Sequence, residues 1–124
     1  MIHRSIVNCV VVVVLAVSSA TLPASATVEG ITTTVTRTLS VSDYRWGGCA
    51  VRLADHPSET GLNCSSDWVT FSCTGDHATK SAAARNYDAA LMAFALGRSV
   101  RVWIDDEKTH NGLCFVNRID VLSP

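Results

Sequence analysis

Two short segments of the chain combine aromatic and cationic side chains in a pattern typical of ligand-binding surfaces. The first is Tyr44-Arg45-Trp46, which precedes a Gly-Gly pair, and the second places Arg101 two residues before Trp103. An exposed indole offers a flat apolar face on which a sugar ring stacks, and a guanidinium pairs with a carboxylate. We therefore expect these five residues to bind a ligand. The alternatives are a cation–π pair that caps a turn at Arg45 and Trp46, and a Trp103 ring covered by the helix expected at Lys80 to Leu96 or by a neighbouring subunit.

The cysteines form the second group of residues that could form covalent bonds or bind a metal. The chain has 5 cysteines, of which Cys9 lies near its start and the other four are Cys49, Cys64, Cys73 and Cys114. The first 26 residues indicate export, as described below, and an even number of cysteines in a small exported domain predicts two disulfides. The alternative is a zinc site built from Cys73-x-x-x-His77 and His110-x-x-x-Cys114. It would leave two cysteines unused and lacks a C-x-x-C pair, so we expect no metal.

Histidines near carboxylates and serines raise the question of catalysis. His56, His77 and His110 all fall in segments expected to be loops, with Asp55 and Asp76 beside two of them. The sequence contains no G-x-S-x-G elbow, no phosphate-binding glycine loop and no dinucleotide fingerprint. We therefore expect no enzymatic activity and no cofactor. A small hydrolase that depends on His77 or His110 is the alternative.

Length and charge restrict the function further. The 124 residues suit one domain, and 10 Lys and Arg against 11 Asp and Glu give a net charge of −1. There is no basic run, so binding to nucleic acid is not expected.

The first 26 residues have the three-part form of a secretory signal peptide. His3 and Arg4 precede an apolar stretch from Ile6 to Val17, and Ala24-Ser25-Ala26 forms an A-x-A cleavage site before Thr27. The apolar stretch is shorter than the roughly 20 residues that cross a bilayer, so we expect no membrane span. The sequence predicts a secreted or periplasmic protein, of bacterial style, whose single folded domain covers residues 27–124.

The rest of the chain alternates strand and turn signals. Segments rich in β-branched residues or with alternating hydrophobicity predict five strands, at about Gly30–Val41, Cys49–Ala54, Asp67–Cys73, Val100–Ile104 and Leu113–Leu122. The acidic stretch Asp105-Asp106-Glu107 is expected to end the fourth strand as a solvated turn. Calcium binding there is the weaker reading, because the spacing of a dedicated calcium loop is missing.

One segment has helical periodicity. Lys80 to Leu96 contains no Gly or Pro, Thr79 or Ser81 can cap its start, and Gly97 follows its end. Its apolar face repeats at three and four residues, through Ala84, Tyr87, Leu91, Phe94 and Ala95. We expect Tyr87, Leu91 and Phe94 to fill the core.

Three strands, one helix and two strands is the order of an OB-fold, a five-stranded Greek-key barrel whose helix closes one end. This mainly β fold also selects among the three disulfide connectivities. Antiparallel pairing of the second and third strands brings Cys49 to Cys73, and parallel pairing of the third and fifth brings Cys64 to Cys114. We predict these two disulfides.

The segment from Tyr87 to Trp103 resembles the B subunits of pentameric toxins of the subtilase-cytotoxin and typhoid-toxin type. In those subunits a helix with a Tyr-x-x-Ala-Leu pattern ends at Gly and leads into a Val-Arg-aromatic strand, and cysteines stand where this chain has Cys49 and Cys73. The resemblance extends to other small exported bacterial proteins. It implies an OB-fold, a homo-oligomer such as a pentamer, glycan binding, a toxin A subunit as partner, and a family aromatic position at Trp103.

The sequence thus predicts a secreted binding module that recognises a glycan or another host-surface ligand. The alternative is a periplasmic or secreted inhibitor or structural protein that acts on a protein partner.

Overall fold

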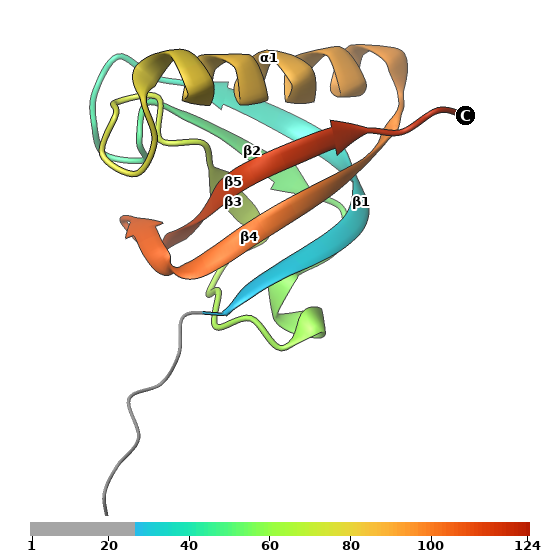
Figure 1. Cartoon of the computed structure of the whole chain (residues 1–124), viewed down its shortest axis with the longest axis horizontal. Coiled ribbons are helices and arrows are strands. Elements are labelled where there is room, and N and C mark those ends of the chain that lie inside the picture. The colour runs from blue at the N-terminus through green and yellow to red at the C-terminus, as the bar shows by residue number, and fades with distance from the viewer. Residues whose placement is uncertain (1–26) are drawn as a thin grey trace, which may run out of the picture.

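Five strands form a closed barrel with one α-helix across its end (Figure 1). The structure, a computed structural model, describes residues 27–124. The elements are β1 (Val28–Ser40), β2 (Cys49–Leu53), the 3-10 turn η1 (Pro57–Thr60), β3 (Trp68–Thr70), α1 (Lys80–Leu96), β4 (Ser99–His110) and β5 (Leu113–Val121). The predicted signal peptide lies outside the described residues. Between residues 27 and 124, no helix is long and apolar enough to cross a membrane.

The barrel closes in the order β1-β2-β3-β5-β4. The long strand β1 pairs antiparallel with β4 through its first half and with β2 through its second, and its register shifts between Val35 and Arg37. Such a bulge bends a strand, which lets β1 serve both sides of the barrel. The parallel pair of β3 and β5 completes the closure. The predicted OB-fold-like barrel, with its single helix between the third and fourth strands, is confirmed.

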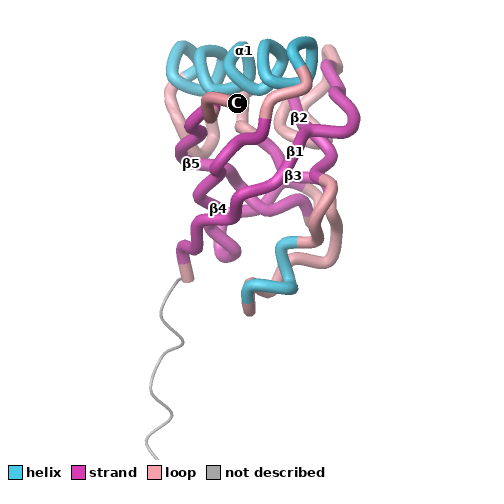
Figure 2. Tube along the Cα trace, turned by 90° about the vertical axis from the view of Figure 1, so that its right-hand side faces the viewer, coloured by secondary structure: helices cyan, strands magenta, loops and turns pink. Residues whose placement is uncertain are grey.

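Helix α1 lies over one end of the barrel, as the two perpendicular views show (Figures 1 and 2). Its bounds match the prediction: the Thr79 hydroxyl accepts a hydrogen bond from the Ala82 nitrogen at 3.3 Å, and Gly97 ends the helix at φ 63°. The predicted buried face is only partly right. The fully buried contacts are Ala83, Ala90 and Ala93, with Tyr87 beside them.

Phe94 was expected in the core but is 46% exposed. The alanines bring the helix close to the strands, and Phe94 follows buried Ala93, so its side chain leaves the helix about 100° further round. Tyr87 does reach the core, where its ring centroid lies 5.9 Å from that of Phe71. Leu91 packs against the same core while remaining partly exposed.

The acidic stretch is not a solvated turn, and this prediction is wrong. Strand β4 continues through it to His110, with a register break between Asp105 and Thr109. Asp105 is only 5% exposed, and its Oδ1 accepts hydrogen bonds from the Glu107 and Lys108 backbone nitrogens. The carboxylate therefore satisfies backbone groups that the bulge leaves without strand partners.

Strand β3 is shorter than predicted because the chain leaves the sheet after Thr70. Ser72 has a φ of 60°, in the left-handed region that interrupts an extended strand. The turn positions Cys73 for its disulfide.

Both predicted disulfides are confirmed. Cys49 pairs with Cys73 and Cys64 with Cys114, with Cα–Cα distances of 5.7 and 5.9 Å. They join β2 to the turn after β3 and the loop before β3 to β5. Two disulfides fit a non-cytoplasmic, oxidising compartment.

Candidate functional site

A pocket with two tryptophans lies on the outer face of the barrel. Its volume is about 330 Å³, and it is lined by Arg37, Thr38, Leu39, Trp46, Trp68 and Leu113. We call it the tryptophan pocket. These residues come from β1, the loop between β1 and β2, β3 and the first position of β5. OB-folds bind oligosaccharides and oligonucleotides on the face of their second and third strands, beside the β1–β2 and β4–β5 loops, which is the same region.

Trp46 reaches the pocket because its loop folds back over β2 and β3. The Thr70 hydroxyl donates to the Trp46 carbonyl at 2.8 Å, and the Thr74 nitrogen donates to the Gly47 carbonyl at 3.1 Å. This cover explains why Ala50 and Thr70, on the outer side of their strands, are completely buried.

Gly47 is required for the fold-back. Its φ is 74°, and a Cβ atom there would collide with the Thr70 hydroxyl and lie 2.8 Å from His110 Cδ2. A side chain at this position is thus excluded both by the backbone conformation and by the lack of space.

Arginines flank both indoles of the pocket. The Arg37 Cζ lies 5.7 Å from the Trp68 ring centroid, and the Arg45 Cζ lies 5.6 Å from that of Trp46. Arg45 also forms an ion pair with Asp43 at 3.9 Å. Among residues 27–124, no carboxylate forms an ion pair with Arg37. A pocket with two apolar faces and this guanidinium suits a ring-shaped ligand that carries an anionic or strongly polar group.

Of the first predicted cluster, only Trp46 lines the pocket. Arg45 lies against the Trp46 ring, as the cation–π alternative requires, whereas Tyr44 is 82% exposed at the tip of the loop. The cation–π alternative therefore holds for Arg45 and Trp46, and ligand binding by this cluster stays a prediction.

The second predicted cluster lies elsewhere. Trp103 and Arg101 share the outer side of β4, as predicted, and the Arg101 Cζ lies 5.0 Å from the Trp103 ring centroid. However, the Arg118 Cζ lies closer, at 4.2 Å, and a Cβ atom on Gly30 would lie 3.1 Å from Trp103 Nε1. The indole thus packs over the glycine of the adjacent strand and under an arginine, which leaves less of the ring available to a ligand. Neither Trp103 nor Arg101 lines the tryptophan pocket.

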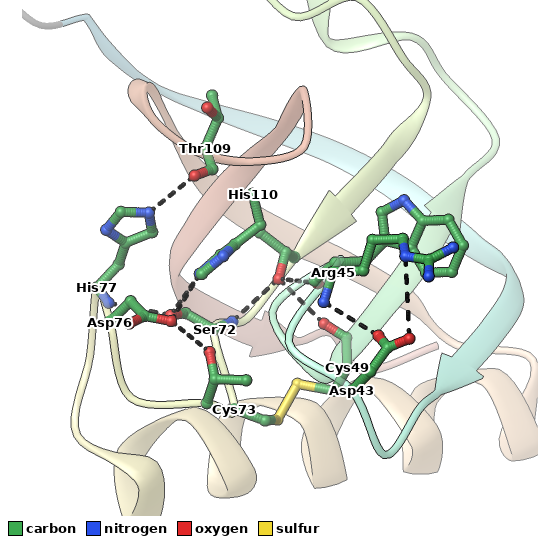
Figure 3. Close-up of polar contacts among 12 residues, drawn as sticks. Asp43, Arg45, Cys49, Ser72, Cys73, Asp76, His77, Thr109 and His110 are labelled. Atoms are coloured by element: carbon green, nitrogen blue, oxygen red, sulfur yellow. Dashed lines mark hydrogen bonds and ion pairs between the residues drawn. A yellow bond between two sulfur atoms is a disulfide. The ribbon is translucent and has the colours of Figure 1, made fainter.

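A polar group that we call the histidine cluster, consisting of Ser72, Asp76, His77 and His110, lies beside the loop that carries Arg45 (Figure 3). His110 Nε2 is 2.9 Å from Ser72 Oγ and 3.7 Å from Asp76 Oδ2. The His77 backbone nitrogen donates to Ser72 Oγ at 3.0 Å, and the two imidazole centroids are 4.7 Å apart. The cluster ties the end of β4 to the segment between β3 and α1.

The cluster does not have the arrangement of a serine hydrolase. In such enzymes the carboxylate binds the imidazole nitrogen opposite the serine, whereas Ser72 and Asp76 both face Nε2 of His110. Ser72 is completely buried, and its hydroxyl oxygen already accepts a hydrogen bond from His77. This geometry suits a structural contact rather than nucleophilic attack.

Burial shifts the pKa values of two side chains, His110 and Tyr87. Burial and the nearby His77 lower the pKa of His110 below 6.5, although Asp76 opposes this effect. Burial raises the pKa of Tyr87, opposed by its hydrogen bond with Thr38. Neutral His110 is therefore favoured in the folded protein.

The zinc site considered from the cysteine–histidine spacing does not form. His77 and His110 do lie together, but Cys73 and Cys114 are bound to Cys49 and Cys64. Within the part of the chain that the structure describes, no group of three or more His, Cys, Asp or Glu side chains is arranged to hold a metal ion.

A second cavity, of about 350 Å³, lies between the same loop, the Cys49–Cys73 disulfide and α1. Its lining is more polar and includes the carboxylates of Asp43 and Asp88. Tyr87 is the one aromatic residue in its lining, whereas two tryptophans line the tryptophan pocket.

Arg37, Trp68 and Leu113 line the pocket but do not stand out as site residues in the sequence. The signal was present for Trp68, because strand alternation places it opposite the core residues Val69 and Phe71. Its approach to Trp46 depends on the folded-back loop, which no local pattern predicts.

Comparisons with protein-family models, curated proteins and solved structures give no match for this chain.

Proposed function

We propose that this protein is a secreted or periplasmic binding module that recognises a glycan in the tryptophan pocket. The observation that carries the proposal is the meeting of Trp46 and Trp68 in a cavity of about 330 Å³, on the face that OB-folds use for ligands. That volume is at the lower end for small-molecule sites, so the pocket suits one or two sugar rings. The proposed binding needs no cofactor.

The side chains fit a sugar in two ways. The indoles of Trp46 and Trp68 offer apolar faces for the C–H side of a pyranose ring. Arg37 lies beside Trp68 without a carboxylate partner among the described residues, so it suits a carboxylate or hydroxyl of the glycan. We infer that Arg45 stabilises Trp46, and that Trp103 and Arg101 contribute at most an outer contact.

A protein partner is the second candidate. Tyr44 is 82% exposed next to Arg45, and aromatic residues and arginine dominate the energetics of protein interfaces. An inhibitor or structural protein would use this loop tip rather than the pocket behind it. A toxin A subunit is one such partner that the resemblance predicts.

The predicted homo-oligomer, such as a pentamer, remains a proposal. Met92, Phe94 and Leu96 on α1 are 52%, 46% and 63% exposed, and their burial would favour association.

A glycan array with purified protein comprising residues 27–124 tests the proposal. We expect binding to at least one glycan, a loss of at least tenfold in affinity for Trp68→Ala and for Arg37→Gln, and wild-type affinity for Trp103→Ala. Circular dichroism and thermal melting establish that each variant is folded.

The alternatives give different results. Glycan binding that is lost in Trp103→Ala but kept in Trp68→Ala would place the site on β4 instead. A monomer by light scattering that binds no glycan would favour the inhibitor or structural protein. Hydrolysis of a substrate that disappears in His110→Gln, with the fold retained, would support the hydrolase.

A further inference from the structure

Asp106 holds the beginning of β1 against β4. The Thr27 backbone nitrogen donates to Oδ1 of Asp106 at 3.3 Å, and the Asp106 nitrogen donates to the Thr27 carbonyl at 3.3 Å. The second carboxylate oxygen, Oδ2, accepts a hydrogen bond from the Asn63 nitrogen at 2.9 Å. One side chain therefore joins the residue before β1, the bulged part of β4 and the loop before β3.

The backbone nitrogen that faces Asp106 is also the atom that processing would change. Ala24-Ser25-Ala26 immediately precedes Thr27 and has the A-x-A form of a signal peptidase site. Hydrolysis would break the C–N bond between Ala26 and Thr27, with the hydroxyl of water added to the Ala26 carbonyl carbon and its hydrogen added to the Thr27 nitrogen. At neutral pH the new amine takes up one proton and the new carboxyl group releases one.

We propose that cleavage before Thr27 creates an α-ammonium group that Asp106 binds as an ion pair, which fastens β1 to β4 in the mature protein. In the uncleaved chain the Asp106 carboxylate accepts from a neutral amide N–H, whereas after cleavage both partners would be charged, which adds an ion-pair attraction to the hydrogen bond. The inference is independent of the ligand that the tryptophan pocket binds.

The charges around Thr27 favour a cation at this position. Asp105 is engaged by the Lys108 ammonium at 3.6 Å and by two backbone nitrogens, whereas no described cation forms an ion pair with Asp106. Glu29 on β1 and Glu107 on β4 add negative charge nearby in the sequence. The new ammonium group would therefore be the cation that Asp106 otherwise lacks.

Four proteins test the role of Asp106: chains that begin at Thr27 or at Ala26, each with and without Asp106→Asn. An additional residue moves the ammonium about 3.8 Å along the chain. We expect the chain that begins at Thr27 to melt about 2 to 5 °C higher than the one that begins at Ala26, in low salt at pH 6.5. Asp106→Asn should remove this difference in melting temperature. The substitution also weakens the hydrogen bond from the Asn63 nitrogen, but it does so equally with both start sites, so that effect cancels in the difference. Glu107→Gln is the matched control and should leave the difference intact.

The pH dependence gives a second readout. An α-ammonium titrates ordinarily at about pH 8, and a neighbouring carboxylate raises that pKa in the folded state. The added stability is therefore present at pH 6.5 and declines as the pH rises through the folded value. No melting difference between the two start sites, or the same difference in Asp106→Asn, would overturn the ion pair.

N-terminal sequencing of the full chain after export from a bacterial host tests the processing step. The expected first residue is Thr27. Any other first residue overturns the cleavage site, whereas the melting comparison tests Asp106 regardless of export.

Discussion

His110 Nε2 lies 2.9 Å from Ser72 Oγ, and this contact ties the last residue of β4 to the turn that follows β3. The His110 side chain is 11% exposed, and the Gly47 backbone, next to Trp46, packs against its ring. A single imidazole therefore supports the loop that forms one wall of the tryptophan pocket. A change in the charge of His110 would act on both stability and binding.

We expect the free energy of unfolding to decrease as the pH falls below 6.5, the ordinary pKa of histidine, because the folded-state pKa of His110 is lower. Between these two values the unfolded chain binds more protons than the folded protein. The contribution is fully present above pH 6.5 and is lost as the pH falls to the folded value, by about 1.4 kcal/mol for each pH unit of that interval. Urea denaturation at pH 7.5, 6.5 and 5.5 measures it.

His110→Gln should make this part of the profile flatter. His56, the N-cap residue of η1, provides the comparison variant, and the part of the slope that belongs to His110 should remain in His56→Gln. A wild-type profile without a slope between pH 6.5 and 5.5, or a slope that disappears in His56→Gln, would show that His110 is not the responsible group.

Gly47 and Gly61 both have a positive φ, and alanine substitutions at these two positions distinguish the cost of backbone strain from the cost of steric collision. Gly61 has a φ of 88° and nothing within 4 Å of an added Cβ atom, so Gly61→Ala should cost about 1 kcal/mol from the backbone alone. Gly47→Ala adds collisions with Thr70 and His110, and we expect it to cost at least about 2 kcal/mol and to weaken ligand binding. Thermal melting and the glycan assay measure the two effects. Equal costs at the two positions would mean that the loop adapts to the extra methyl group.

Local patterns predicted the barrel and its disulfides because each signal was strong on its own. The helix from Lys80 to Leu96 has a capping residue and a following glycine, and the order of elements then fixed which cysteines meet. The end of β4 was not predictable in this way. The Asp105 carboxylate accepts hydrogen bonds from the Glu107 and Lys108 backbone nitrogens in the bulge, and these bonds exist only in the folded strand.

The candidate site was harder to predict than the fold. Trp46 and Trp68 are separated in the sequence and line the same pocket because hydrogen bonds from Thr70 and Thr74 hold the loop over β3. Alternation predicted that Trp103 points outward, but it carries no information on Arg118, which is on another strand. Contacts between strands, rather than residue types along one strand, decide which aromatic ring a ligand can reach.

The buried face of α1 provides a test of the helix register. Ala90 is completely buried, so Ala90→Leu should cost about 1 to 3 kcal/mol by overpacking. Phe94 is 46% exposed, so Phe94→Ala should cost well under the roughly 3 to 5 kcal/mol expected for a fully buried phenylalanine. Urea denaturation of both variants measures the order of these costs. A larger loss of unfolding free energy for Phe94→Ala than for Ala90→Leu would instead support the buried helix face predicted from the sequence, which includes Phe94.

The packing of Trp103 over Gly30 predicts an energetic coupling between these two positions. In the native protein, a Cβ atom on Gly30 would lie 3.1 Å from Trp103 Nε1 and 3.2 Å from Arg101 Nε, so Gly30→Ala should be destabilising. Trp103→Ala should itself cost about 1 to 2 kcal/mol, because it uncovers the glycine and removes the ring on which Arg118 stacks. With the indole removed, Gly30→Ala should become neutral or stabilising, since alanine loses less backbone entropy in a strand than glycine does. A double-mutant cycle should give a coupling of at least about 0.5 kcal/mol. Additive effects would mean that the indole does not rest on Gly30, and the Trp103 ring would then again be available to stack on a sugar.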